Sequence, residues 1–138
     1  MFHVEVCEPK RIMWSRFQGE LAERDFAALD ALGRERQGGP PYDIVFDLRF
    51  VEQAHLATEF VSKRGELPQA FANRERIYVV PQDDLKLVVR LYAADRQSKG
   101  WRPPTVAETL EEALQRLQVT RADFRPVSLS VAARDEPA

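Results

Sequence analysis

Cysteine and histidine are scarce in this sequence, which holds one cysteine and two histidines in 138 residues. Cys7 has no partner for an internal disulfide, and a zinc site of four cysteines is excluded. His3 and His55 could hold a metal only if carboxylates completed the site. We therefore expect neither a metal nor a cofactor. This cysteine usage is typical of a cytoplasmic protein.

An excess of positive charge is also lacking. Twenty Lys and Arg residues stand against 22 Asp and Glu residues, which gives a net charge of −2. Such a chain offers no strongly basic surface to nucleic acid or to an anionic membrane. The apolar runs are far shorter than the roughly 20 residues that cross a bilayer, and the N-terminus lacks the pattern of a signal peptide. We expect no nucleic-acid partner and no membrane insertion.

The remaining composition is that of a globular protein, with 44% hydrophobic and 30% charged residues. This balance is too apolar for a disordered chain, and the length is typical of one domain. We place that domain at residues 1–119 and a C-terminal extension at 120–138. In the extension, residues 124–131 are compatible with an additional edge strand and 132–138 with a loose end.

Hydrophobic periodicity predicts alternating strands and helices. Strands are expected at 2–7, 12–17, 42–48, 76–81 and 105–107, and helices at 20–37, 54–67, 85–99 and 109–117. Asp83 and Asp84 offer a carboxylate cap for the third helix, and Thr109 with Glu112 forms a capping box for the fourth. The order ββαβαβα(β)α predicts an α/β fold with a mixed, mostly parallel sheet.

Four local motifs carry a family resemblance. They are W-S-R-F-Q-G-E-L at 14–21, I-V-F-D-L at 44–48, I-Y-V-V-P-Q at 77–82 and T-L-E-E-A-L-Q-R-L at 109–117. In this order the chain resembles the STAS-like domain proteins of the SpoIIAA-like (anti-sigma-factor antagonist-like) family. The resemblance implies a STAS-like sheet with packed helices and a module that binds a protein partner. In antagonists of the SpoIIAA type, it also implies a phosphorylatable serine at the start of the second helix.

The switch region of that family falls on residues 54–58 of this sequence. The Ser, Asp and Gly of the family pattern are absent there, and the nearest hydroxyl belongs to Thr58. We therefore expect no functional phospho-switch, and we keep His55 and Thr58 as the candidates for this region. The resemblance is closer to a branch for which binding of a nonpolar ligand has been suggested.

Catalytic candidates are few. The sequence contains no phosphate-binding glycine motif, nucleophile elbow or zinc-protease motif. His55 at a predicted loop-to-helix junction is compatible with a general base. Four aspartates near strand ends are compatible with metal binding, although helix capping and solvation explain them more simply: Asp43, Asp47, Asp83 and Asp84. A hydrolase or transferase built on these residues is the least favoured alternative, and we predict no enzyme.

The third predicted helix is apolar on two sides. One stripe is typical of a core-facing surface and consists of Leu85, Val88, Val89, Tyr92 and Ala93. Leu87, Leu91 and Ala94 fall on nearly the opposite side. Either Trp101 or residues 124–131 cover this second side, or it stays exposed as a binding surface. We predict a partner- or ligand-binding surface made of Leu87, Leu91, Ala94 and Trp101.

These features favour a non-enzymatic regulatory or interaction module. Its partner is another protein or a second copy of the chain, as in a homodimer. The alternative is a protein that binds or senses a small nonpolar ligand.

Overall fold

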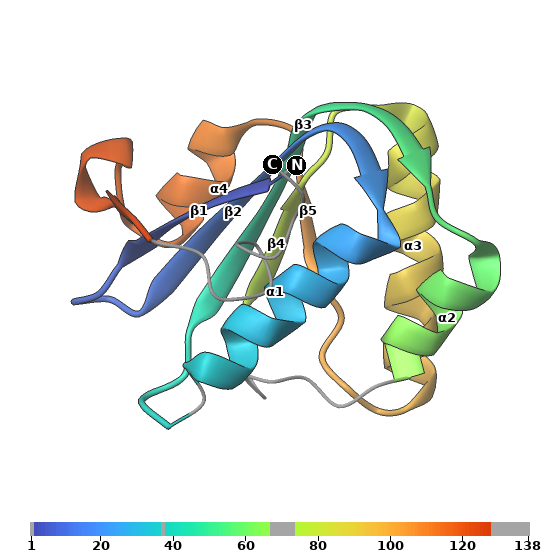
Figure 1. Ribbon diagram of the computed structural model, residues 1–138, viewed down its shortest axis with the longest axis horizontal. Helices are drawn as coiled ribbons and strands as arrows, with labels where there is room; N and C mark the ends of the chain where they lie inside the picture. The colour runs from blue at the N-terminus through green and yellow to red at the C-terminus, as the bar shows by residue number, and fades with distance from the viewer. Residues whose placement is uncertain (1, 37, 67–73, 128–138) are drawn as a thin grey trace.

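The computed structural model describes residues 2–36, 38–66 and 74–127. Within these ranges, six strands form one sheet in the order β5-β4-β3-β2-β1-β6 (Figure 1). Strands β2 to β5 pair in parallel, whereas β1 is antiparallel to both β2 and β6. The predicted α/β class and mostly parallel sheet are therefore confirmed. The elements are β1 (Phe2–Cys7), β2 (Ile12–Ala22), α1 (Glu23–Glu35), β3 (Asp43–His55), α2 (Thr58–Glu66), β4 (Arg76–Val79), α3 (Asp83–Ser98), β5 (Thr105–Ala107), α4 (Leu110–Arg116), the 3-10 turn η1 (Arg121–Asp123) and β6 (Arg125–Pro126).

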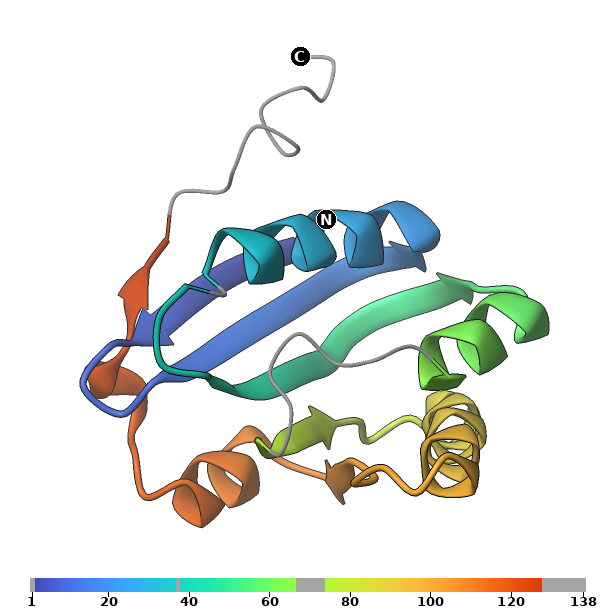
Figure 2. The same ribbon diagram turned by 90° about the horizontal axis from the view of Figure 1, so that it is seen from below.

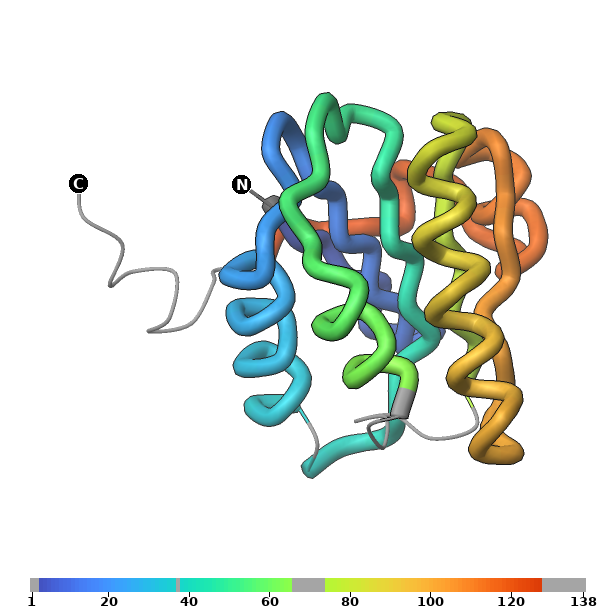
Figure 3. Tube along the Cα trace, turned by 90° about the vertical axis from the view of Figure 1, so that its right-hand side faces the viewer, coloured from blue at the N-terminus to red at the C-terminus, as the bar shows by residue number. Residues whose placement is uncertain are grey.

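The helices divide between the two faces of the sheet. Helices α1, α2 and α3 lie side by side (Figure 3), while α4 lies on the opposite side of the sheet from α1 (Figure 2). The sheet separates two apolar clusters. The first lies under α1, α2 and α3 and includes Phe17, Phe46 and Tyr78. The second lies under α4 and includes Trp14 and Phe124, whose rings meet edge to face at 5.4 Å.

Strands β2 and β3 are longer than predicted, so two predicted helix starts are wrong. Helix α1 begins at Glu23 rather than at residue 20, and α2 begins at Thr58 rather than at 54. The reason is pairing between distant segments, because residues 18–22 of β2 bond to residues 50–55 of β3. Gly19, with a φ of 68°, allows the irregular register at this point.

The predicted carboxylate cap of α3 is also wrong. The N-cap position is Gln82, and its side chain makes no cap bond. Its Nε2 instead donates to the carbonyl oxygens of Leu48 and Val51 on β3, at 2.8 and 3.1 Å. Strand β4 ends at Val79, so the edge of β3 that faces away from β2 is not paired with β4 in this part of the strand. The Gln82 amide therefore supplies the donor that a neighbouring strand would supply.

The predicted strand at 105–107 and the predicted helix at 109–117 agree closely with β5 and α4. The Thr109 side chain accepts a hydrogen bond from the Glu112 N–H at 3.1 Å and caps α4. Of the predicted strand at 124–131, Arg125–Pro126 forms β6 beside β1. Several predicted residues lie outside the described ones: residue 37 of the first helix, residue 67 of the second helix, residues 128–131 of that strand and the predicted loose end at 132–138.

Candidate ligand-binding pocket

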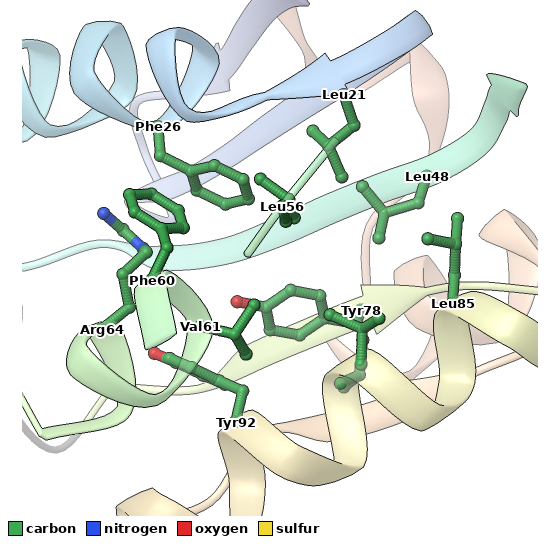
Figure 4. A pocket seen from close by; sticks show the side chains of 12 residues that line it. Leu21, Phe26, Leu48, Leu56, Phe60, Val61, Arg64, Tyr78, Leu85 and Tyr92 are labelled. Atoms are coloured by element: carbon green, nitrogen blue, oxygen red, sulfur yellow. The ribbon is translucent and has the colours of Figure 1, made fainter. Parts of the chain in front are cut away.

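An apolar cavity of about 40 Å³ lies between α2, α3 and the sheet (Figure 4). Strands β2, β3 and β4 each contribute a side chain from the face that carries the first cluster. Helix α3 contributes residues spaced three and four apart, which is the spacing that places side chains on one side of a helix. The lining consists of Leu21, Phe26, Leu48, Leu56, Phe60, Val61, Arg64, Tyr78, Leu85, Val88, Val89 and Tyr92.

Aromatic rings form much of the pocket wall. Phe26 of α1 and Phe60 of α2 lie with ring centroids 5.8 Å apart. On the other side, Tyr78 is stacked on Phe46 at 4.4 Å with an interplanar angle of 11°, and Tyr92 lies 5.9 Å from Tyr78. Each such ring pair stabilises its own geometry by about 0.5–1.5 kcal/mol beyond burial. The wall of the pocket is therefore held in place by neighbouring rings.

Arg64 supplies the cationic group of the lining. Its Nη1 and Nη2 donate to Oδ2 and Oδ1 of Asp30 on α1, at 2.9 and 3.0 Å. The guanidinium also lies 4.7 Å from the centroid of the Phe26 ring. Burial by itself lowers the pKa of Arg64, but the hydrogen bonds and the charge of Asp30 raise it above its ordinary value. The pair keeps a charged group at the pocket and ties α2 to α1.

The two tyrosines carry the other polar atoms of the lining. Burial, and after it the neighbouring Tyr92, raises the pKa of Tyr78 far above its ordinary value. The phenol is therefore protonated at neutral pH and able to donate a hydrogen bond. Figure 4 shows the hydroxyl groups of Tyr78 and Tyr92 in the same part of the pocket as Arg64.

Helix α2 closes one side of the pocket. Among its described side chains, Val61 and Gly65 are buried and the others are half-buried or exposed. At Gly65 the backbone of α2 lies close to α3. A Cβ atom at this position would be 2.5 Å from the Asp95 Cβ and 3.1 Å from the Tyr92 carbonyl oxygen. A close backbone approach is therefore one of the contacts that hold α2 against α3.

The two switch-region candidates lie outside this pocket. His55 is the last residue of β3 rather than the start of a helix, and its Nε2 lies 3.6 Å from Glu20 Oε1. Thr58 is the first residue of α2, and its side chain is exposed. The prediction that His55 lies at a loop-to-helix junction is therefore wrong. His55 pairs with Ala22 at the end of β3, and two loop residues separate it from the start of α2.

The strand-end aspartates are dispersed rather than gathered. Asp47 is 0% exposed, and it accepts hydrogen bonds from Trp14 Nε1 at 3.1 Å and from Arg49 Nε at 2.9 Å. Asp43 is the first residue of β3, whereas Asp47 lies inside the strand, and Asp43 accepts a hydrogen bond from Arg74 Nη2 at 2.9 Å. Asp83 and Asp84 form the first turn of α3. Within the described ranges, no group of three or more His, Cys, Asp or Glu residues is placed to hold a metal ion.

The predicted surface on α3 is partly assembled. Leu87 is 63% exposed, and Ala94 is exposed on the same side of the helix. Leu91 is half-buried and packs against the first cluster. Trp101 lies instead against Arg96, with 4.3 Å between the guanidinium carbon and the ring centroid. Arg96 is buried with Leu85, Val89 and Tyr92, so Trp101 belongs to a different side of α3 from Leu87.

The residues that polarise the pocket were missed by the sequence analysis. Tyr78 and Tyr92 fit the apolar pattern of a strand and a helix, so they were assigned to the core. The available signal was Arg64, which stands four residues after Phe60 and so shares its side of the second helix. An arginine beside an apolar stripe indicates an acidic partner, which here is the half-exposed Asp30.

Comparison with models of known protein families and with curated protein sequences gives no match for this chain. None of the helices in the described ranges is both long enough and apolar enough to span a membrane.

Proposed function

We propose that this chain is a non-catalytic binding module that holds a small, mainly apolar ligand beneath α2. The observation that carries this proposal is the pocket of about 40 Å³ with its lining of leucines, valines and aromatic rings. Such a lining favours a ligand that leaves water, at about 25 cal/mol for each Å² of apolar surface buried. The four STAS-like sequence motifs support a cytoplasmic regulatory module of this kind.

Ligand entry requires α2 to move outward. An apolar cavity of about 150 Å³ accepts a six-carbon ring, whereas this pocket has about 40 Å³. Helix α2 is suited to such a movement because few of its described side chains are buried. The ion pair between Arg64 of α2 and Asp30 of α1 lies close to the surface. This ion pair can therefore break and form again when a ligand enters. Ligand binding would then change the outer surface of α2, which a partner protein can recognise.

The pocket lining favours retention of a ligand over chemical change. Arg64 is bound to Asp30, and the Tyr78 phenol is protonated because burial raises its pKa. Neither group has the properties of a general base at neutral pH. His55 lies outside the lining.

A titration with cyclohexane, followed by amide chemical shifts of the whole protein, tests the proposal. We expect shifts concentrated in α2 and in residues 85–92 of α3, with saturation. Shifts spread over both clusters, or none up to the solubility limit, would contradict a ligand site beneath α2.

Two valine substitutions provide a matched pair for the same experiment. Val61 lines the pocket and is 6% exposed, while Val119 lies in the second cluster and is 7% exposed. Val61→Phe and Val119→Phe both add a ring to a packed site and should each destabilise the fold by about 1–3 kcal/mol. Only Val61→Phe should abolish cyclohexane binding. Equal effects of the two variants on binding would show that the probe responds to stability alone.

Association with a protein partner or with a second copy is the second proposal, and one observation favours it. The outer side of α3 exposes Leu87, and the edge strand β5 exposes Val106 at 42%. Exposed apolar side chains beside an unpaired strand edge are typical of an association surface.

A further inference from the structure

The pocket is polar at one end and apolar at the other. In Figure 4 the drawn nitrogen and oxygen atoms belong to Arg64, Tyr78 and Tyr92, and all of them lie in one half of the view. Leu21, Leu48 and Leu85 occupy the other half. These side chains come from five different elements, so the separation is a property of the folded chain. A ligand with no polar atom would leave this arrangement unused.

The polar end retains a hydrogen-bond donor for a ligand. The rings of Tyr78 and Tyr92 lie with their centroids 5.9 Å apart, and both hydroxyls lie at this end of the pocket (Figure 4). Each hydroxyl carries one O–H, so even a hydrogen bond from one hydroxyl to the other would leave one O–H. The stacking of Tyr78 on Phe46 limits where its hydroxyl can point. The remaining O–H is therefore held at the pocket, where it can donate to an acceptor atom.

The polar end does not favour a negative charge on the ligand. The guanidinium of Arg64 is already matched by the carboxylate of Asp30 through two hydrogen bonds. A second carboxylate would have to leave water for an apolar pocket without a cation of its own, which is costly. An uncharged oxygen, such as a carbonyl, needs only the donor that the tyrosine pair provides.

We infer that the pocket takes a compact amphipathic molecule, with an uncharged acceptor oxygen bound by the Tyr78–Tyr92 pair and a hydrocarbon part against Leu21, Leu48 and Leu85. This inference rests on the proposed function. It changes the ligand class from purely nonpolar molecules to ketones, aldehydes or esters of small hydrocarbons, which the pocket binds in one orientation.

The test compares three probes that share one ring, cyclohexane, cyclohexanone and cyclohexanecarboxylate, on the full chain. The double variant Tyr78→Phe, Tyr92→Phe removes both hydroxyls and keeps both rings. Because the two hydroxyls are removed together, neither is left behind as a buried unsatisfied group, and the cost in stability should be small. We expect the double variant to lose about three- to tenfold in affinity for cyclohexanone, which is the net effect of one hydrogen bond. Its affinity for cyclohexane should be unchanged.

The other outcomes separate the inference from the proposed function. If cyclohexanone and cyclohexane lose affinity equally, or if neither does, the polar end has no role in binding and the inference fails. Tighter binding of cyclohexanecarboxylate than of cyclohexanone would also contradict it. If no probe binds to the unmodified protein, the proposed function itself fails. Tyr42→Phe is the control, because its hydroxyl binds Arg36 and Glu8, outside the pocket, and it should leave all three affinities unchanged.

Discussion

Gly65 is the residue at which the absence of a side chain has the clearest structural consequence. It lies in α2 and faces α3, where a Cβ atom would come within 2.5 Å of the Asp95 Cβ. Real Cβ atoms do not approach each other so closely, so one helix would have to shift. Glycine costs an average helix about 1 kcal/mol relative to alanine. At Gly65 this cost is offset because only glycine allows the close contact with α3 that positions α2 over the pocket.

Gly65→Ala should therefore destabilise the protein despite the better helix propensity of alanine. We expect a loss of about 1–3 kcal/mol in the free energy of unfolding, which is typical of overpacking. Amide exchange should also become faster in α2 than in α1. The control is Gly38→Ala, because a Cβ atom at residue 38 would meet no atom within 4 Å. Urea unfolding that gives the two variants equal midpoints would refute this account of the α2–α3 contact.

At the scale of elements, the sequence predicts best where local pattern and tertiary pairing agree. Strand β5 and the start of α4 occur where predicted, because the Thr109 cap is a local feature. The ends of β2 and β3 could not be predicted in this way. Residues 20–22 and 54–55 fit a helical pattern, yet they pair with each other across the sheet. Ladder bonds between segments more than thirty residues apart therefore override local propensity.

The side chain of Gln82, at the start of α3, bonds to the backbone of β3, and replacing Gln82 tests how much these bonds stabilise the fold. Gln82→Ala leaves the carbonyl oxygens of Leu48 and Val51 without the donor described above. We expect a loss of about 1–3 kcal/mol in the free energy of unfolding, the cost of unsatisfied buried polar groups. Gln97→Ala is the control, since Gln97 is an exposed glutamine of the same helix. Equal thermal midpoints for the two variants would mean that water satisfies these carbonyls.

At the scale of the whole molecule, the candidate site was predicted only in part. The two-sided apolar pattern of α3 predicts that Leu87 and Leu91 share a second apolar side of the helix. It could not show that Leu91 packs inward while Leu87 stays in water. That difference depends on α2, which packs beside α3 from another part of the chain. The pocket itself is formed by six elements, and no local sequence pattern predicts that they contact one another.

Leu87 and Leu91 should respond differently to the same substitution. Leu87→Ser removes an exposed side chain, so the melting midpoint should change little. If the outer side of α3 is an association surface, Leu87→Ser should shift sedimentation velocity profiles toward the monomer. Leu91→Ser should lower the melting midpoint, because half-buried apolar contacts are lost. A monomeric unmodified protein would rule out self-association and leave a different protein as the partner for this surface.

Cys7 lies in the second cluster, on the opposite side of the sheet from the pocket, and it is buried. Thiol reagents react with the exposed thiolate, so modification of Cys7 reports how often that side of the molecule opens. Movements of α2 alone leave the second cluster closed. The chain thus carries a native kinetic probe whose labelling rate separates opening of the pocket from unfolding of the whole domain, without any introduced label.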